Sequence, residues 1–181
     1  MTALRSLSEP GTGSARALWL AALVMPGVAA SLVFACTAPF AAVAAWAALT
    51  LSTRDGRMAA AALWAGNQAV GFAVLGYGFR TEALSWSVAM LAAAILAFEA
   101  ARLVSAAAGG TTARVAAAVG MALVTHQAAM WLATFPLGNT DGSSLAIVGD
   151  VAVFNLVWAA GLGLAFAALA GRMRAALAPS R

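Results

Sequence analysis

The side chains best suited to chemistry in this sequence are polar residues that stand inside long apolar stretches. The candidate ligand-binding residues among them are Asn67, Gln68, His126, Gln127, Asp150 and Asn155. Amide, imidazole and carboxylate groups can hold and orient a small ligand, and they are costly to bury without a partner. Tyr77 and Trp131 lie near the ends of the same stretches and are added as candidate aromatic contacts.

His126 is the only histidine and Cys36 the only cysteine, so an internal disulfide and a multi-cysteine metal cluster are excluded. Met130 follows His126 by four residues and shares its helix face. Cys36, His126 and Met130 would form a soft site for copper or a cobalt-containing ligand. Their loose spacing favours another role for His126, a hydrogen bond to a facing polar side chain such as Asn67 or Asn155.

The composition decides what surrounds these residues. Of 181 residues, 64% are hydrophobic and only 9% are charged, whereas a soluble domain carries about 25% charged residues. We therefore predict an all-α integral membrane protein that contacts the lipid bilayer, a bundle of six transmembrane helices. The predicted spans are 17–35, 40–52, 58–79, 83–104, 115–135 and 145–170, which makes 17–170 the transmembrane domain. Residues 1–16 and 171–181 are then terminal tails.

The arginines test this map. With the N-terminus inside, nine of the ten fall on one side, namely Arg5, Arg16, Arg54, Arg57, Arg102, Arg114, Arg172, Arg174 and Arg181. Only Arg80 falls on the other side. Such an asymmetry predicts that both termini are cytoplasmic. The lack of lysine indicates a GC-rich bacterial genome, and we expect a multi-pass protein of the bacterial inner (plasma) membrane.

Local signals add detail to the spans. Pro26 should kink the first helix, and the shortness of the second predicts a helix packed among the others or a local thinning of the bilayer. Residues 53–57 are interpreted as a loop. Ser143 or Ser144 can cap the last helix, and Glu99 is expected to pair with Arg102.

Small residues at helical spacing predict close helix contacts. The first such stripe, on the third span, is Ala60, Trp64, Asn67, Gly71, Val74 and Gly78. It is either a packing face or the wall of a pocket. The second stripe, on the sixth span, is Asn155, Ala159, Gly163, Ala167 and Gly171. It either packs internally or docks a membrane partner. Tyr77, Trp86 and Trp131 form an interfacial belt or line the mouth of a site for a flat organic ligand.

Several function classes find no support in the sequence. Hydrolase and phosphate-loop motifs are absent, so we expect neither an enzyme nor a cofactor. The positive charge is explained by membrane topology, and a nucleic-acid partner is not expected.

The architecture resembles the substrate-binding S component of energy-coupling-factor vitamin transporters, in its six predicted helices, its length, its cytoplasmic termini and an outward-facing polar pocket. The resemblance rests on architecture and not on a motif. It implies a vitamin or cobalt-type (corrinoid) ligand, a coupling subunit that docks on the Asn155–Gly171 stripe, and a lid formed by Cys36 and residues 138–143.

Two alternatives remain open. In the first, the protein is a non-transporting accessory subunit of a larger membrane complex, and the polar residues only hold helices together. Buried polar pairs in bilayers contribute about 0.6 kcal/mol on average, which modestly favours a pocket. In the second, the protein is a metal-ion permease that uses Cys36, His126, Met130 and Asp150.

Overall fold

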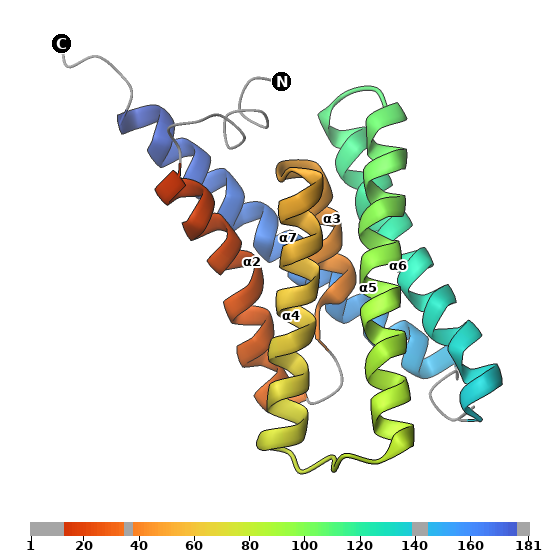
Figure 1. Cartoon of the computed structure of the whole chain (residues 1–181). Coiled ribbons are helices and arrows are strands. Elements are labelled where there is room, and N and C mark those ends of the chain that lie inside the picture. The colour runs from red at the N-terminus through yellow and green to blue at the C-terminus, as the bar shows by residue number, and fades with distance from the viewer. Residues whose placement is uncertain (1–12, 35–37, 139–144, 177–181) are drawn as a thin grey trace.

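The computed structural model describes residues 13–34, 38–138 and 145–176, and it confirms the predicted all-α fold for these ranges. The helices are α2 (Gly13–Phe34), α3 (Phe40–Thr50), α4 (Thr53–Ala73), α5 (Thr81–Ala107), α6 (Thr111–Leu137) and α7 (Leu145–Ala176). They run alternately up and down, so that α2 begins and α7 ends at the same end of the bundle (Figure 1). We call this the terminal end. The opposite end carries the connection between α4 and α5 and is called the α4–α5 end.

Four helices of the described chain, α2, α5, α6 and α7, are long and apolar enough to cross a membrane. Their outer faces carry large apolar side chains that are exposed in the described structure, among them Val88, Leu103 and Leu164. Such a surface suits lipid and not water. The helices therefore fit a multi-pass membrane protein, as the composition predicts.

Helix α3 forms the centre of the bundle. Its residues from Phe40 to Ala47 are all buried, and α4, α5, α6 and α7 all pack against it. A helix that is apolar on every side has to be enclosed, so the predicted packing of this short segment among the others is confirmed. With 11 residues, α3 is roughly 16 Å long, and it extends only part of the way from the terminal end (Figure 1).

Helix α7 crosses the bundle at a steep angle (Figure 1) and contacts α3 through residues of the second small-residue stripe. The Asn155 side-chain oxygen accepts a hydrogen bond of 3.1 Å from the Ala42 backbone N–H. The Trp46 indole N–H donates to the Ala159 carbonyl at 2.7 Å. A Cβ at Gly163 would lie 2.8 Å from Cζ2 of Trp46, so only glycine allows this approach. The stripe therefore packs internally through its first three residues.

Aromatic side chains fill the space between α2, α3 and α7. Trp19 meets Trp46 edge-on, with ring centroids 6.5 Å apart, and Phe166 at 5.2 Å. The Trp19 indole N–H donates to the Thr50 hydroxyl at 2.8 Å, so its polar atom is satisfied within an apolar core.

The prediction that residues 53–57 form a loop is wrong, because these residues begin α4. Ser52 is the N-cap: its hydroxyl oxygen accepts from the Asp55 backbone N–H at 3.2 Å and its O–H donates to the Asp55 carboxylate at 2.6 Å. Gly56 is not a turn residue either. A Cβ at this position would lie 2.1 Å from Cε2 of Phe98, so this glycine allows α4 and α5 to approach.

Charged side chains gather at the terminal end. Arg16 of α2 pairs with Asp55 of α4. Glu99 of α5 accepts from Arg102 at 3.4 Å, as predicted, and also from Arg57 of α4 at 2.6 Å. These pairs join α2 to α4 and α4 to α5.

The third predicted span ends early. Helix α4 stops at Ala73, and the Tyr77 backbone N–H returns to the Gly71 carbonyl at 3.1 Å. Gly76 and Gly78 have φ values of 70° and 71°, a left-handed conformation that only glycine adopts without strain. Gly78 therefore does not belong to the helical stripe predicted for this span.

The remaining boundaries shift by a few residues at helix ends. Helix α2 already includes Gly13–Arg16 of the predicted tail and contains Pro26. Helix α6 runs past Pro136 and ends at Leu137, with Gly138 as a left-handed cap. Helix α7 continues to Ala176. Ser143 and Ser144 lie outside the described residues.

Candidate functional site

A cavity of about 500 Å³ lies at the α4–α5 end of the bundle. Helices α3 to α7 and the connection between α4 and α5 all contribute to it. Its lining residues are Ala38, Phe40, Asn67, Gln68, Tyr77, Arg80, Glu82, Ala83, Trp86, Ser87, Met90, His126, Gln127, Met130, Trp131, Thr134, Ile147, Val148 and Val151. The volume falls in the range of about 300–1,000 Å³ that is typical of small-molecule sites.

The short central helix explains where the cavity lies. Phe40, the first residue of α3, lines the cavity, and the longer α4 and α5 continue beyond this level toward the α4–α5 end (Figure 1). Ala38, just before α3, lines it as well. The space enclosed by α4 to α7 beyond α3 is therefore available as a cavity.

Six of the eight predicted ligand-binding residues line this cavity, namely Asn67, Gln68, Tyr77, His126, Gln127 and Trp131. They come from α4, the following connection and α6. Residues from two different predicted spans, the third and the fifth, are thus gathered at one site.

Asn155 and Asp150 do not line the cavity. Asn155 is buried, with its oxygen on the Ala42 N–H and its amide donating to the Val151 carbonyl at 3.0 Å. Ala42 lies in the first turn of α3, where backbone N–H groups have no partner within the helix. Asn155 therefore caps α3 from another helix. Asp150 is exposed. Neither residue therefore contributes to the wall of this cavity.

His126 lines the cavity, and its two ring nitrogens form no hydrogen bond in the described structure. The residue is 7% exposed, and both ring nitrogens are buried without a hydrogen-bond partner among the described residues. Its ring stacks on Phe40, with centroids 5.7 Å apart and planes 15° from parallel. The predicted hydrogen bond to Asn67 or Asn155 is therefore not formed. Unpaired buried polar atoms are rare in folded proteins and point to a missing partner.

Asn67 and Gln68 form the polar side of the cavity on α4. The Asn67 amide donates to the Ser31 hydroxyl of α2 at 2.9 Å, and the Gln68 amide donates to the Asn67 oxygen at 3.1 Å. Ser31 in turn donates to the Gly27 carbonyl at 3.2 Å. These hydrogen bonds to α2 fix the orientation of the Asn67 side chain. The Gln68 side chain is less buried.

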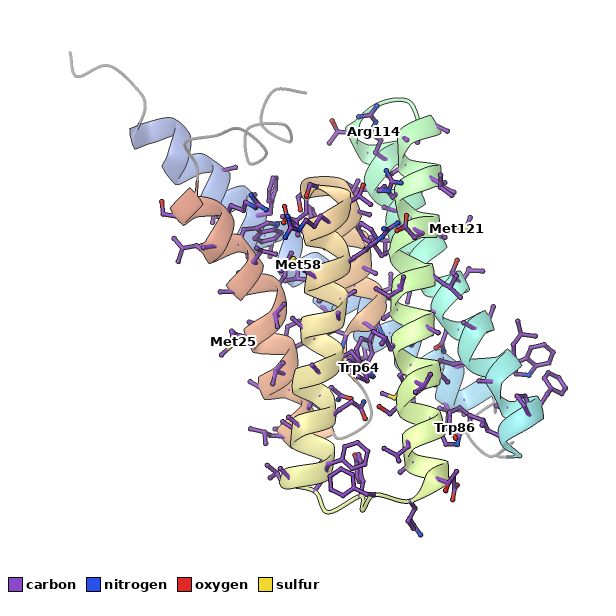
Figure 2. All side chains as sticks on the ribbon, viewed as in Figure 1. Met25, Met58, Trp64, Trp86, Arg114 and Met121 are labelled. Atoms are coloured by element: carbon purple, nitrogen blue, oxygen red, sulfur yellow. The ribbon has the colours of Figure 1, made fainter. Side chains whose placement is uncertain are left out.

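Aromatic residues form much of the remaining wall. Trp64 of α4 donates its indole N–H at 2.8 Å to the carbonyl of Ser87 on α5, a residue that lines the cavity. Trp86 lies near the α4–α5 end of α5 (Figure 2) and lines the cavity, but its indole nitrogen is buried without a partner among the described residues. The Tyr77 ring packs over Gly71, where a Cβ would lie 2.6 Å from two of its ring carbons.

Sequence reasoning missed several lining residues. Phe40, Ser87, Met90 and Thr134 carry no distinctive signal in an apolar sequence. Arg80 and Glu82 are not among the predicted ligand-binding residues, although both line the cavity and both are exposed.

The ion pair between Arg16 and Asp55 lies away from the cavity. Burial raises the pKa of the Asp55 carboxyl, but hydrogen bonds from Ser52 and Arg16 and the charges of Arg16 and Arg54 outweigh this effect, so the pKa lies below its ordinary value of 3.8. Asp55 begins α4 at the terminal end and none of these groups lines the cavity.

Two of the three predicted metal ligands lie at the same cavity. His126 and Met130 both line the cavity, whereas Cys36 lies outside the described residues. Within the described ranges, no group of three or more His, Cys, Asp or Glu side chains could hold a metal ion. The cavity thus offers hydrogen-bonding and aromatic groups. Neither family models, nor curated proteins, nor solved structures show a match to this chain.

Proposed function

We propose that the protein is the substrate-binding component of a small-molecule uptake transporter in a bacterial inner membrane. The observation that carries this proposal is the cavity of about 500 Å³ with His126 in its wall, buried and without a partner among the described residues for either ring nitrogen. An unpaired polar atom at such a site costs about 1–3 kcal/mol. A protein that needed these residues only to hold helices together would pair them, as it pairs Asn155 with Ala42.

The positions of the arginines support an outward-facing cavity. Five arginines lie near helix ends at the terminal end of the bundle, namely Arg16, Arg54, Arg57, Arg102 and Arg114; Figure 2 marks Arg114 there. Arg80 lies at the α4–α5 end. By the positive-inside rule the terminal end faces the cytoplasm. The proposal therefore has six spans, with α3 and α4 crossing together with the four long helices, and a cavity open to the outside.

The size of the cavity bears on the ligand. About 500 Å³ suits a molecule of ordinary drug or vitamin size. A corrinoid is far larger, so we favour a smaller organic ligand. In this proposal uptake is driven by a separate coupling subunit. Ala167 and Gly171, the exposed part of the second stripe, are offered as its contact, because the first three residues of the stripe are engaged by α3.

The proposal is tested by native mass spectrometry of the protein purified gently from the membrane of its host. We expect a retained small molecule, and its loss in the His126→Leu variant although that variant still inserts and folds. Gly161→Ala serves as the control, since a Cβ at this exposed position meets nothing within 4 Å. Cells that lack the protein should also fail to accumulate the identified molecule.

Other outcomes would replace the proposal. An empty protein held in a fixed complex with other membrane proteins would indicate an accessory subunit. Metal transport by the protein alone in proteoliposomes would indicate a permease, with His126 and Met130 on its path.

A further inference from the structure

The charges around the cavity are confined to one place. Among its lining residues only Arg80 and Glu82 carry charged side chains, and both are exposed at the start of α5. No ion pair joins them in the described part of the chain. The deeper wall is neutral. Asp150, the nearest candidate acid on α7, is exposed and does not line the cavity.

A neutral wall selects against a charged ligand group inside the cavity. Removing an ion from water without a partner is far more costly than burying a neutral polar group. An ionic group of a ligand would be tolerated only near Arg80 or Glu82, at the exposed margin. The part of the ligand that enters the cavity should therefore be uncharged.

The polar groups of the wall require a ligand that both donates and accepts hydrogen bonds. A neutral imidazole has one donor and one acceptor nitrogen, and both nitrogens of His126 lack partners in the described protein. The Trp86 indole can only donate, and it too is unpaired. Together these residues call for at least one ligand donor and two acceptor positions.

The apolar part of the wall favours a flat ring system. Four aromatic residues, Phe40, Tyr77, Trp86 and Trp131, line the cavity together with Met90 and Met130. Aromatic faces and thioether sulfur both make favourable contacts with aromatic rings. His126 already stacks on Phe40, so a planar ligand would extend an existing arrangement of rings.

From this combination we infer that the cavity binds an uncharged planar heterocycle that carries an N–H group beside a carbonyl, as in a lactam or a pyrimidinone. The unprotonated nitrogen of His126 would accept from the ligand N–H, the His126 N–H on the opposite side of the ring would donate to a second ligand acceptor, and the Trp86 indole would donate to the ligand carbonyl. The inference rests on the proposed function, whose ligand class it narrows. Neither nitrogen of His126 is open to solvent, so the ring has to adjust when the ligand enters.

Three small probes of nearly the same shape test the inference. They are 2-quinolinone, which has both the N–H and the carbonyl, N-methyl-2-quinolinone, which lacks the N–H, and the N-methylquinolinium cation. Binding is measured by equilibrium dialysis against the full chain in lipid nanodiscs, with empty nanodiscs subtracted. We expect 2-quinolinone to bind, its N-methyl derivative to bind about tenfold more weakly for the lost hydrogen bond, and the cation not to compete.

Substitutions at His126 and Trp86 test which residue distinguishes 2-quinolinone from its N-methyl derivative. His126→Leu should bring the two quinolinones to nearly equal affinity. Trp86→Phe keeps an aromatic ring and removes the N–H, so it should weaken both quinolinones about equally, by several-fold. Gly161→Ala is the control, because this exposed residue does not line the cavity and a Cβ there meets nothing within 4 Å, and it should leave both affinities and the tenfold preference unchanged.

The outcomes separate this inference from the proposed function. Equal affinity of the quinolinones for the unchanged protein, competition by the cation, or no binding of 2-quinolinone would overturn the inference. A retained natural ligand that lacks a flat uncharged ring would also overturn it, while supporting the proposed function. Absence of any retained ligand together with unimpaired uptake in cells lacking the protein would overturn both.

Discussion

Replacing His126 by leucine should stabilise the empty protein, an unusual result for a buried histidine in a helix bundle. Both ring nitrogens are buried without partners in the described chain, and each costs about 1 kcal/mol or more. The stacking on Phe40 that would be lost is worth about 0.5–1.5 kcal/mol. Leucine retains apolar contact with Phe40. The net change is therefore a stabilisation of roughly 1 kcal/mol.

Asn155→Leu is the matched comparison, because leucine has the same branched shape as asparagine. This change removes the acceptor of the Ala42 N–H and the bond to the Val151 carbonyl. The Ala42 N–H would remain buried and unpaired at the start of α3. We expect a destabilisation of about 1–3 kcal/mol. The two variants thus remove one polar side chain each from the bundle with opposite effects.

The assay is reversible unfolding in mixed lipid–detergent micelles, followed by tryptophan fluorescence, on protein dialysed to remove bound ligand. Helical content of each variant before unfolding is checked by circular dichroism. If His126→Leu loses as much stability as Asn155→Leu, then His126 is a structural tie between helices. That result would refute the reasoning that its partner is a ligand.

Three further changes test the packing and the charges. Gly163→Ala should destabilise the bundle by about 1–3 kcal/mol, because the new Cβ would lie 2.8 Å from Trp46; Gly161→Ala should not, and equal effects would contradict the α3–α7 contact. The lowered pKa of Asp55 contributes stability that is present above pH 3.8 and is lost as the pH falls through the folded-state pKa; acid unfolding should show this loss, and Asp55→Asn should weaken it. Glu99→Gln should cost less than about 1 kcal/mol in thermal unfolding, since its partner Arg57 is largely exposed.

The sequence by itself determined the class of the protein and the depth of its polar residues. The apolar content and the length of the runs predict helices that suit lipid, and the distance of a residue from a helix end sets its level in the bundle. This is why six of the eight candidates reached one cavity. The Ser-x-x-Asp pattern at Ser52 and Asp55 also held a capping signal, although the nearby arginines and Gly56 led to a loop interpretation.

The direction in which each polar residue faces was decided only by the tertiary structure. In alanine-rich helices that are apolar on all sides, the sequence has no clear amphipathic period from which an inward face can be read. Asn155 and His126 look alike in the sequence, yet one caps α3 and the other lines the cavity. The steep crossing of α7 and the shortness of α3 separate their roles, because the packing of the described helices gives Asn155 a hydrogen-bond partner and gives His126 none.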